Sequence, residues 1–515
     1  MTEQERTKHY SMSASASPET MPSGDEVSHL RRVLKPRHLT MIAIGGAIGT
    51  GLFVASGATI AQAGPGGALL TYLIIGAMVY FIMTSLGELA AFMPVPGSFA
   101  TYASRYVDKG FGFALGWNFW FSWAVVVAVD LVAAQLVMAY WFPDVPGILW
   151  SGLFLLLMLG LNAFSARGFG ESEYWFSLIK VVAVICFLAT GVAILAGIVH
   201  TGHMPGFANW TVGEAPFVGN FATMVGVAMV VAYSFQGTEL VGVAAGESED
   251  PRRNVPRAIR RVFWRILLFY VLSIAVIGFL IPYTDPHLLR SEVSDIAVSP
   301  FTLVFEQAGL LAAATVMNAV ILTSVLSAGN SGMYAATRML FNMAREGMAP
   351  RRFARLSRSG VPLYALLGTT ALASLCLLSA VYSPQAVYIW LLNLAGMTEF
   401  IVWLSIAVSH YRFRKGYVLH GHDVQALPYR AGLFPFGPLF AFVLCLVITL
   451  GQNYEAFLQD RIDWGGALST YLGILLFLAT WAGYRTVCRS RWVRYEDMRF
   501  DFADVEDAAG PPARG

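Results

Sequence analysis

The first apolar stretch of the chain reads HLTMIAIGGAIGTGLFVASGATIAQ over residues 38–62, and its glycine-rich middle decides how the fold is interpreted. The stretch exceeds the ~20 mainly apolar residues that a helix needs to cross a bilayer. Glycines crowd its centre, GGAIGTG at residues 45–51, where they weaken a continuous helix. A later apolar stretch, residues 221–245, carries a related interruption, SFQGTE at residues 234–239. The sequence therefore predicts two membrane-crossing helices that are each broken near the middle.

Similar apolar stretches continue along the whole chain. Hydrophobic residues make up 56% of the 515 residues and charged residues only 13%, against ~25% charged residues in soluble domains. The stretches long enough to cross a bilayer are 38–62, 68–93, 114–141, 147–164, 174–199, 221–245, 262–282, 306–331, 362–382, 386–410, 433–450 and 464–484. This pattern excludes a soluble protein and predicts an all-α polytopic membrane protein with 12 transmembrane helices.

Basic residues are distributed unevenly between the two sides of the predicted bundle. With the N-terminus inside, 31 of the 34 Lys and Arg residues lie in the tails and inside loops, while Arg290 and Arg461 lie outside and Lys180 lies within a span. Cytoplasmic loops carry such an excess, so both termini are predicted to be cytoplasmic. The net charge of only +2 excludes a general attraction to nucleic acid. A basic run taken alone could suggest binding of anionic lipid or nucleic acid, but the topological interpretation is favoured because it explains every loop at once, and membrane lipid is the expected surrounding of the bundle.

The chain ends and the cysteines suggest no further chemistry. Residues 1–30 are polar and rich in Ser and Thr, which predicts a disordered cytoplasmic tail, and residues 486–515 form a second cytoplasmic tail. The four cysteines lack CxxC or Cys/His spacing, which argues against a metal site or a disulfide framework. No nucleophile, histidine and acid set occurs within the spans, so the protein is not expected to be an enzyme.

The two predicted breaks suggest a binding site. A helix that breaks in mid-membrane presents free N–H groups at one new end and free carbonyls at the other. The first end suits a carboxylate and the second suits an ammonium. A zwitterionic amino acid has both groups on one carbon, so two adjacent breaks would form a receptor for it. The alternative is that glycines such as Gly45 and Gly49 only let helices pack closely; the matching break in the sixth span favours a binding site.

Few ionisable residues lie within the spans, and each is costly enough to need a reason. Glu239, beside the break in the sixth span, is the strongest candidate for substrate or proton handling, although it could instead tie the loose segment to a neighbour. Lys180 is the only basic residue predicted at depth, where it could replace a bound metal ion or extend its head group to the interface. Asp130, on the helix face of Trp123, could receive a cationic side chain. Glu399 in the tenth span is a weaker case.

Two aromatic residues adjoin these candidates. Tyr233 immediately precedes the break in the sixth span, and Trp123 faces inward if Asp130 does. Either ring could cover a substrate or stack against an aliphatic stem. For Trp123, simple packing is an equally good interpretation.

Three longer motifs surround these candidates: GGAIGTGLFVASG at residues 45–57, SFQGTELVGVAAGESEDPRRNVPRAI at 234–259 and LSAGNSGMYAATRML at 326–340. Together they resemble the amino acid permease family of the amino acid–polyamine–organocation superfamily. IPYTDP at 281–286, SHYRFRKGYVL at 409–419 and GQNYEAFL at 451–458 are similar to the lysine-transporting bacterial members of that family. The resemblance extends over about residues 30–500.

The resemblance implies a transporter domain over residues 31–500 that is built as a five-plus-five inverted repeat. The first repeat would cover residues 31–200 and the second residues 215–411, with helices 1 and 6 unwound and helices 11 and 12, within residues 430–485, at the periphery. It also implies import driven by the proton gradient, without a cofactor or sodium, across the bacterial cytoplasmic membrane.

The resemblance also implies roles for individual residues. The residues that would hold the substrate carboxylate are Ala47, Gly49, Thr50 and Gly51, and Phe235 and Gly237 would help them to hold the α-amine. Tyr233 would be the gate aromatic of helix 6, Glu239 the functional carboxylate, and Lys180 the cation that replaces sodium. Glu247, in ESEDP, would belong to a cytoplasmic gate.

Two residues depart from the family pattern. Phe119 stands where a tyrosine is expected, and its ring offers no hydroxyl group for a contact there. Glu399 replaces what looks like a small residue in relatives, and the resemblance gives it no role.

We therefore expect a secondary transporter that imports L-lysine with protons by alternating access. The lysine ε-ammonium needs acceptors in a low-dielectric site, and the expected partners are Glu239 or Asp130 with the neutral residues Ser327 and Asn330. A broader cationic amino-acid or polyamine carrier, an exchanger and a membrane nutrient sensor remain open alternatives. The sequence does not identify a regulatory membrane partner.

Overall fold

The structure, a computed structural model, describes residues 34–45, 48–49, 51–95, 97–164, 166–199, 206–285, 288, 299–384, 386–388, 391, 395, 398–452 and 464–500. Helices dominate this part of the chain, which contains no β-strand and a single isolated bridge between Leu34 and Ser248.

The helices follow one another with short connections. The α-helices are α1 (Pro36–Gly45), α2 (Ser56–Phe92), α3 (Ser98–Tyr106), α4 (Lys109–Met138), α5 (Gly147–Phe164), α6 (Ala166–Leu195), α7 (Phe221–Ser234), α8 (Leu240–Ala244), α9 (Pro251–Arg265), α10 (Leu272–Leu280), α12 (Pro300–Gln307), α13 (Leu311–Arg345), α14 (Leu363–Ala373), α16 (Thr398–Leu419), α17 (Phe436–Gly451) and α18 (Trp464–Cys488). The 3-10 and π-helical segments are η1 (Gly51–Ala55), η2 (Phe207–Trp210), η3 (Ala245–Glu247), η4 (Ile266–Val271), η5 (Arg351–Ala354), η6 (Ser374–Ala380), η7 (Val424–Ala426) and η9 (Tyr495–Asp497).

Many of these helices could cross a membrane. Among the described residues, 8 helical stretches are long and apolar enough to do so: Ser56–Phe92, Lys109–Met138, Gly147–Phe164, Phe169–Leu195, Pro251–Leu280, Ala312–Arg345, Leu363–Ala380 and Tyr471–Cys488. Two further apolar helices, α7 and α17, are shorter. The fold is therefore all-helical and has the character of a polytopic membrane protein, while the count of twelve spans stays a prediction.

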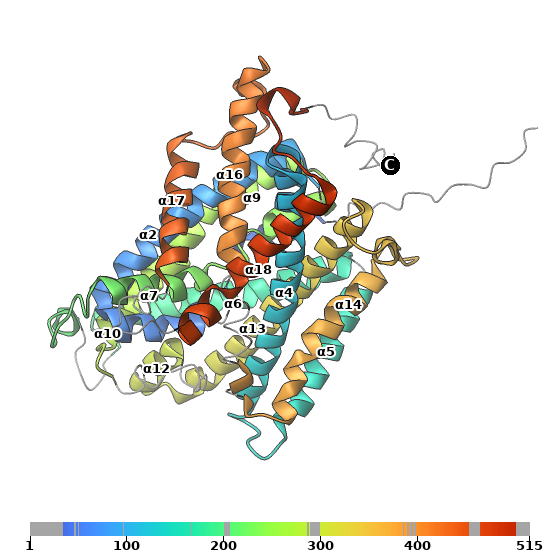
Figure 1. Ribbon diagram of the computed structural model, residues 1–515. Helices are drawn as coiled ribbons and strands as arrows, with labels where there is room; N and C mark the ends of the chain where they lie inside the picture. The colour runs from blue at the N-terminus through green and yellow to red at the C-terminus, as the bar shows by residue number, and fades with distance from the viewer. Residues whose placement is uncertain are drawn as a thin grey trace, which may run out of the picture.

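The centre of the bundle is formed by α4 and α13, which pack along each other. The apolar part of α4 is 89% buried, whereas that of α18 is only 6% buried, so α18 lies at the periphery. Figure 1 shows α4 running the height of the molecule, with α5 and α14 side by side at one edge. The leucines that α5 exposes, including Leu149, Leu153 and Leu156, fit contact with lipid better than contact with water.

A glycine corner connects the first two predicted spans within α2. Gly64 has a φ of 74° and is followed by Pro65, so the helix axis kinks there. The carbonyl of Pro216 accepts hydrogen bonds from the backbone N–H groups of Gly66 (2.9 Å) and Gly67 (3.2 Å). A Cβ on Gly64 would lie 2.7 Å from that same carbonyl oxygen. Both the backbone angle and the close approach therefore require glycine at this corner.

Two helical stretches bury arginines that charge counting assigns to loops. α13 continues to Arg345, whereas the predicted span ends at residue 331, so Arg338 lies inside the helix. Arg265 lies in the apolar stretch Pro251–Leu280. Each of these arginines is 1% exposed. Burial inside the protein is therefore not confined to Lys180 among the basic residues, because a buried arginine can be stabilised by partners that are distant in the sequence. That Lys180 is the only basic residue at membrane depth stays a prediction.

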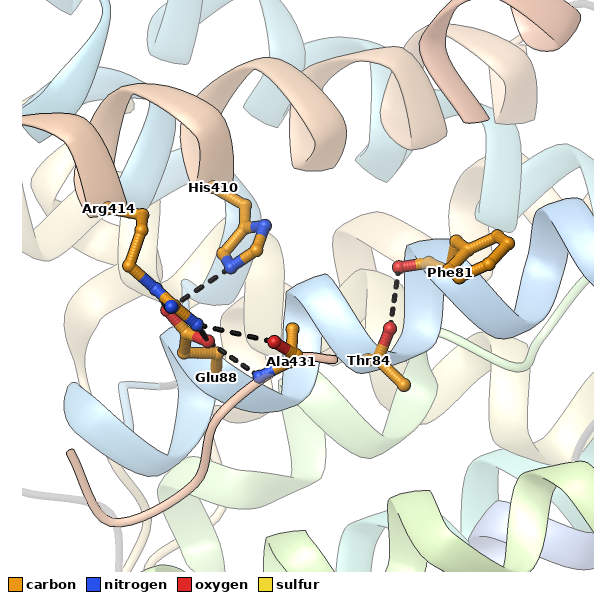
Figure 2. A network of polar contacts seen from close by, with 6 residues as sticks. All are labelled: Phe81, Thr84, Glu88, His410, Arg414 and Ala431. Atoms are coloured by element: carbon orange, nitrogen blue, oxygen red, sulfur yellow. Dashed lines mark hydrogen bonds and ion pairs between the residues drawn. The ribbon is translucent and has the colours of Figure 1, made fainter. Parts of the chain in front are cut away.

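A buried charge network connects α2, α16 and the segment before α17 (Figure 2). Glu88 of α2 is fully buried and accepts a hydrogen bond from Arg414 Nε at 2.6 Å and a second one from Nη2 of the same guanidinium. His410 Nε2 lies 3.2 Å from the carboxylate, and the backbone N–H of Ala431 donates to it at 2.7 Å. A buried carboxylate with this many donors is well compensated, so the network fixes the position of α16 on α2.

Candidate functional site

The two interrupted stretches of the sequence meet in space. α1 ends at Gly45, and the next helical segment, η1, begins at Gly51. A Cβ on Gly51 would lie 2.5 Å from the Cα of Ser234, the last residue of α7. Side chains do not tolerate such a distance, so glycine is what lets the two backbones approach. The start of η1 therefore lies directly against the end of α7.

The sixth predicted span forms two helices, α7 and α8, with a turn between them. α7 begins with a capping box made by Asn220 and Thr223. Residues 235–239 form turns in which N–H groups bond three residues back, as Phe235 does to the carbonyl of Ala232 at 2.9 Å. Gly237 has a φ of 91° within this turn, a conformation that favours glycine. The regular helical ladder is thus interrupted beside η1.

Aromatic packing holds one side of this turn. Phe235 is fully buried and stacks on Tyr270 with 4.3 Å between ring centroids. The hydroxyl groups of Tyr72 and Ser234 lie 3.2 Å apart. Because its ring fills the space between α2 and η4, Phe235 has only its backbone available for the predicted contact with a substrate.

A second group of polar residues, the Lys180 cluster, consists of Asp130, Glu173, Ser177, Lys180 and Ser327. The three α6 members lie on one face, because they are four and three residues apart. The Glu173 carboxylate accepts hydrogen bonds from Ser327 Oγ at 2.8 Å and Ser177 Oγ at 3.1 Å. Lys180 is fully buried and interacts electrostatically with Glu173 and Asp130. The cluster combines one cation with two acids and connects α4, α6 and α13.

Asp130 and Trp123 both face α13. A Cβ on Gly329 would lie 3.3 Å from Asp130 Cβ, and a Cβ on Gly332 would lie 2.7 Å from the ring of Trp123. The indole N–H of Trp123 is buried and has no hydrogen-bond acceptor among the described residues. A polar ligand on this face could satisfy that N–H.

Tyr233 belongs to the same region. It lies in the last turn of α7 and interacts electrostatically with Asp130 of α4 and with Tyr388. The end of α7 therefore faces the part of α4 that carries Asp130. This arrangement brings the predicted gate aromatic close to the Lys180 cluster.

The two α13 residues that were predicted to meet an ammonium, Ser327 and Asn330, already have partners. Ser327 donates to Glu173, as described above, and Asn330 Oδ1 accepts a hydrogen bond from Asn162 Nδ2 of α5 at 2.8 Å. The Nδ2 group of Asn330 is buried and has no acceptor within the described part of the chain. Its free group is thus a donor, which suits a carboxylate or carbonyl better than an ammonium.

Two buried acids, Glu239 and Glu399, lie close enough to share a hydrogen bond, and we call them the carboxyl pair. Glu239 is fully buried at the end of the turn, and Glu399 is 5% exposed near the start of α16. Glu239 Oε2 accepts a hydrogen bond from the backbone N–H of Gly237 at 3.1 Å. Glu399 Oε2 accepts a hydrogen bond from Gln236 Nε2 at 3.4 Å. The turn therefore lies against α16 through polar contacts.

Glu247 forms a third site, in an ion pair with Arg338 of α13, and both side chains are 1% exposed. The guanidinium also lies over the ring of Tyr334, 4.4 Å from its centroid, and Phe169 stacks on that ring at 3.9 Å. The carbonyl of Glu247 accepts the backbone N–H of Leu34 at 3.0 Å. These contacts join η3, α6, α13 and the segment before α1.

The predicted site residues are thus divided among separate places. Lys180, Asp130 and Ser327 share one cluster, Glu239 lies in the carboxyl pair, and Glu247 lies in the ion pair with Arg338. Gly49 is buried, and its Cβ position lies 3.3 Å from Ala328 Cβ of α13. Ala47 and Thr50 lie outside the described residues.

Sequence reasoning missed two residues of these clusters. Glu173 lies seven residues before Lys180, which is a same-face spacing that could have revealed it. Arg338 gave no such signal, because its acid, Glu247, is distant in the sequence. Within the described residues, no three His, Cys, Asp or Glu side chains gather as metal ligands would.

Comparisons with known proteins give a consistent result. The family model described as Amino acid permease matches residues 38–495. The lysine-specific permease LysP of Escherichia coli (strain K12) is 68% identical over 475 residues, which cover 92% of this chain and 97% of that protein. LysP of Lactococcus lactis subsp. cremoris (strain MG1363) is 48% identical, with 92% and 93% covered. The histidine permease HisP of the same organism is 46% identical, with 92% and 98% covered.

Proposed function

The chain belongs to the amino acid permease family, and from this premise we propose that it is a secondary transporter that imports L-lysine together with protons by alternating access. The main support for lysine as the substrate is the 68% identity to a lysine-specific permease over 97% of that relative's length. A second lysine-specific permease, at 48% identity, supports the same substrate.

The proposed architecture is a bundle of twelve spans in the bacterial inner membrane, with both termini in the cytoplasm. Its first ten spans form two inverted repeats, residues 31–200 and 215–411, and its last two are peripheral. Support comes from the eight apolar helical stretches and from the interruptions at corresponding positions, between α1 and η1 and between α7 and α8. Glycine-interrupted segments at matching places in two halves are typical of transporters with a central substrate site.

The proposed substrate site lies where η1 meets the end of α7. Backbone groups of residues 47–51, with those of Phe235 and Gly237, would bind the α-carboxylate and α-amine. The contact of Gly51 with Ser234 supports this placement, because it leaves no side chain between the two backbones. Trp123 and Asp130, which face α13, would lie along the aliphatic stem and ammonium of lysine.

In the proposed transport cycle, charged residues outside the proposed substrate site have separate roles. Lys180 would act as a fixed cation in place of a metal ion, held by Glu173 and Asp130. Glu247 and Arg338 would close the cytoplasmic side, and burial of their ion pair supports this role. The driving force would be the proton gradient, with Glu239 as the proton-handling carboxylate and no cofactor.

Uptake into liposomes tests the proposal. Purified protein is reconstituted, and the entry of labelled L-lysine is followed with and without an imposed proton gradient. We expect accumulation only with the gradient, and uptake that ignores the gradient would contradict symport.

A broader carrier is the second candidate, because a histidine permease is 46% identical over nearly its whole length. Competition by unlabelled arginine, ornithine and histidine separates the two. A lysine-specific carrier predicts that only lysine competes strongly at equal concentration, whereas equal competition by the others would show a broader substrate range.

A further inference from the structure

The carboxyl pair contains two buried oxygen atoms that lack a donor. Glu239 Oε1 and Glu399 Oε1 accept no hydrogen bond from any described residue, although each residue's Oε2 is used. The buried indole N–H of Trp403 lies close to both carboxyls but completes a hydrogen bond to neither. Buried acceptors without donors are rare and costly. Two such oxygens, on carboxyl groups close enough to share a hydrogen bond, indicate that the missing partner is a hydrogen atom.

Electrostatics lead to the same conclusion. Two carboxylates that lie this close in a buried site repel each other. One of them therefore takes up a proton while the other stays ionised. The protonated acid then donates an O–H to its neighbour, which supplies a donor for one free oxygen and an acceptor for the other. The two residues therefore titrate as a unit that holds one proton.

The surroundings of the pair balance that single negative charge. Arg265 of α9 is buried and interacts electrostatically with Glu239 and with Tyr270 of η4. The polar neighbours from the turn and α16 are Gln236, the Gly237 N–H and Trp403, and α17 contributes Cys445 next to Glu399. With one proton on the pair, the pair and Arg265 together are neutral. Loss of that proton leaves an uncompensated buried charge, so the loaded state is favoured in this arrangement.

We propose that Glu239 and Glu399 together form the binding site of the transported proton, with Glu399 as the partner that lets Glu239 hold it. This inference rests on the proposed proton-coupled lysine transport and assigns a function to Glu399. A proton from water bonds to one Oε1, and the new O–H donates to the other Oε1. On release the O–H bond breaks, its electron pair stays on the carboxylate, and the proton leaves to water on the opposite side.

The position of the carboxyl pair explains how lysine binding could control the affinity of the pair for its proton. Glu239 lies on the turn between α7 and α8, beside the proposed substrate site, whereas Glu399 lies on α16. A movement of the turn against α16 changes the distance between the two carboxyls and hence their affinity for a shared proton. Linkage then requires the proton to change the affinity for lysine by the same factor. The lysine ammonium is a poorer candidate for the pair, because a proton needs no space between two buried groups.

The test compares two transport assays on the full-length protein in liposomes. Counterflow, in which labelled lysine exchanges with unlabelled lysine inside, needs no proton gradient. Accumulation is measured under a pH difference of one unit, with the membrane potential held at zero. For one proton per lysine, that difference sustains about tenfold accumulation. The variants are Glu399→Gln, Glu399→Asp and Glu239→Gln, and Glu306→Gln, an exposed acid on α12, is the matched control.

The proposal predicts that Glu399→Gln keeps counterflow within about threefold but loses the tenfold accumulation, because the amide cannot release a proton. Glu399→Asp should retain accumulation with a shifted pH profile, and Glu306→Gln should behave as the unmodified protein. Full accumulation by Glu399→Gln would overturn the proposal. Loss of counterflow by folded Glu399→Gln would also overturn it, since that would place the lysine ammonium on Glu399. Absence of proton-driven accumulation in the unmodified protein would instead refute the proposed function itself.

Discussion

The burial of Lys180 depends on partners that lie far away in the sequence. A lysine in the middle of an apolar helix could extend toward the interface, yet this side chain is fully buried and interacts with Glu173 and Asp130. Ser177 and Ser327 complete the hydrogen bonding of Glu173. The cost of burying a cation is therefore offset by two acids and two hydroxyls on three helices.

Replacing Lys180 by methionine should destabilise the protein and slow transport. The substitution leaves Glu173 and Asp130 as buried acids without a cation, and breaking a buried pair costs ~3–5 kcal/mol. Thermal unfolding of the purified protein and initial rates of lysine uptake measure the two effects. The double variant Lys180→Met with Glu173→Gln should be more stable than the sum of the single effects predicts. Simple additivity of the two losses would contradict a direct charge interaction.

The sequence could predict some of these residues but not their pairing. Lys180 and Glu239 were found because a charge within an apolar span needs a reason. Glu173 was missed because the predicted span began at residue 174, one position too late. Glu399 was noticed, but its partner could not be predicted, because the contact joins α16 to a turn far away in the chain.

At the scale of elements, the interrupted segments are the feature that local chemistry explains best. Glycines permit both the close approach of η1 to α7 and the positive φ of Gly237 in the turn. The glycine-rich positions could be predicted from the sequence, and two helices broken in mid-membrane stay a prediction. The orientation of Phe235 could not be predicted, since the stacking of its ring on Tyr270 depends on how η4 packs.

Substitution of Gly51 by alanine should separate these two segments. The new Cβ would lie 2.5 Å from Ser234 Cα, so one backbone must move, at a cost of about 1–3 kcal/mol. Because a small misplacement at a binding site is enough to cost ~100-fold in rate, lysine uptake should fall by 10- to 100-fold. Gly152→Ala on α5 is the matched control, since, apart from its own helical turn, no heavy atom of a described residue lies within 4 Å of its Cβ position. Equal uptake by both variants would argue against the close contact.

At the scale of the whole molecule, the positions of the apolar helices could be predicted better than the contacts between them. The predicted span 147–164 coincides with α5, and 464–484 lies within α18. The predicted span 306–331 overlaps α13, which continues through Arg338 to Arg345. Hydropathy treats an arginine as the end of a span, whereas the ion pair with Glu247 allows that arginine to be buried inside a helix.

The proposed orientation predicts which membrane face exposes the end of α18. Cys488, the last residue of that helix, is exposed, whereas Cys376 and Cys445 are buried. A membrane-impermeant maleimide should label Cys488 in inside-out vesicles and leave it unlabelled in intact cells. Cys488→Ser should abolish that labelling, while Cys186, exposed on the apolar helix α6, stays unmodified by a water-soluble reagent. Labelling of Cys488 from outside intact cells would reverse the assigned orientation.

The central claim is that lysine and a proton enter together, and it can be measured directly. The protein is reconstituted into liposomes that contain a pH-sensitive dye, with equal pH on both sides and the membrane potential held at zero. We predict that external L-lysine acidifies the interior at a rate that follows the entry of labelled lysine, and that a proton ionophore abolishes the acidification. Entry of lysine without any acidification of the interior would contradict proton symport.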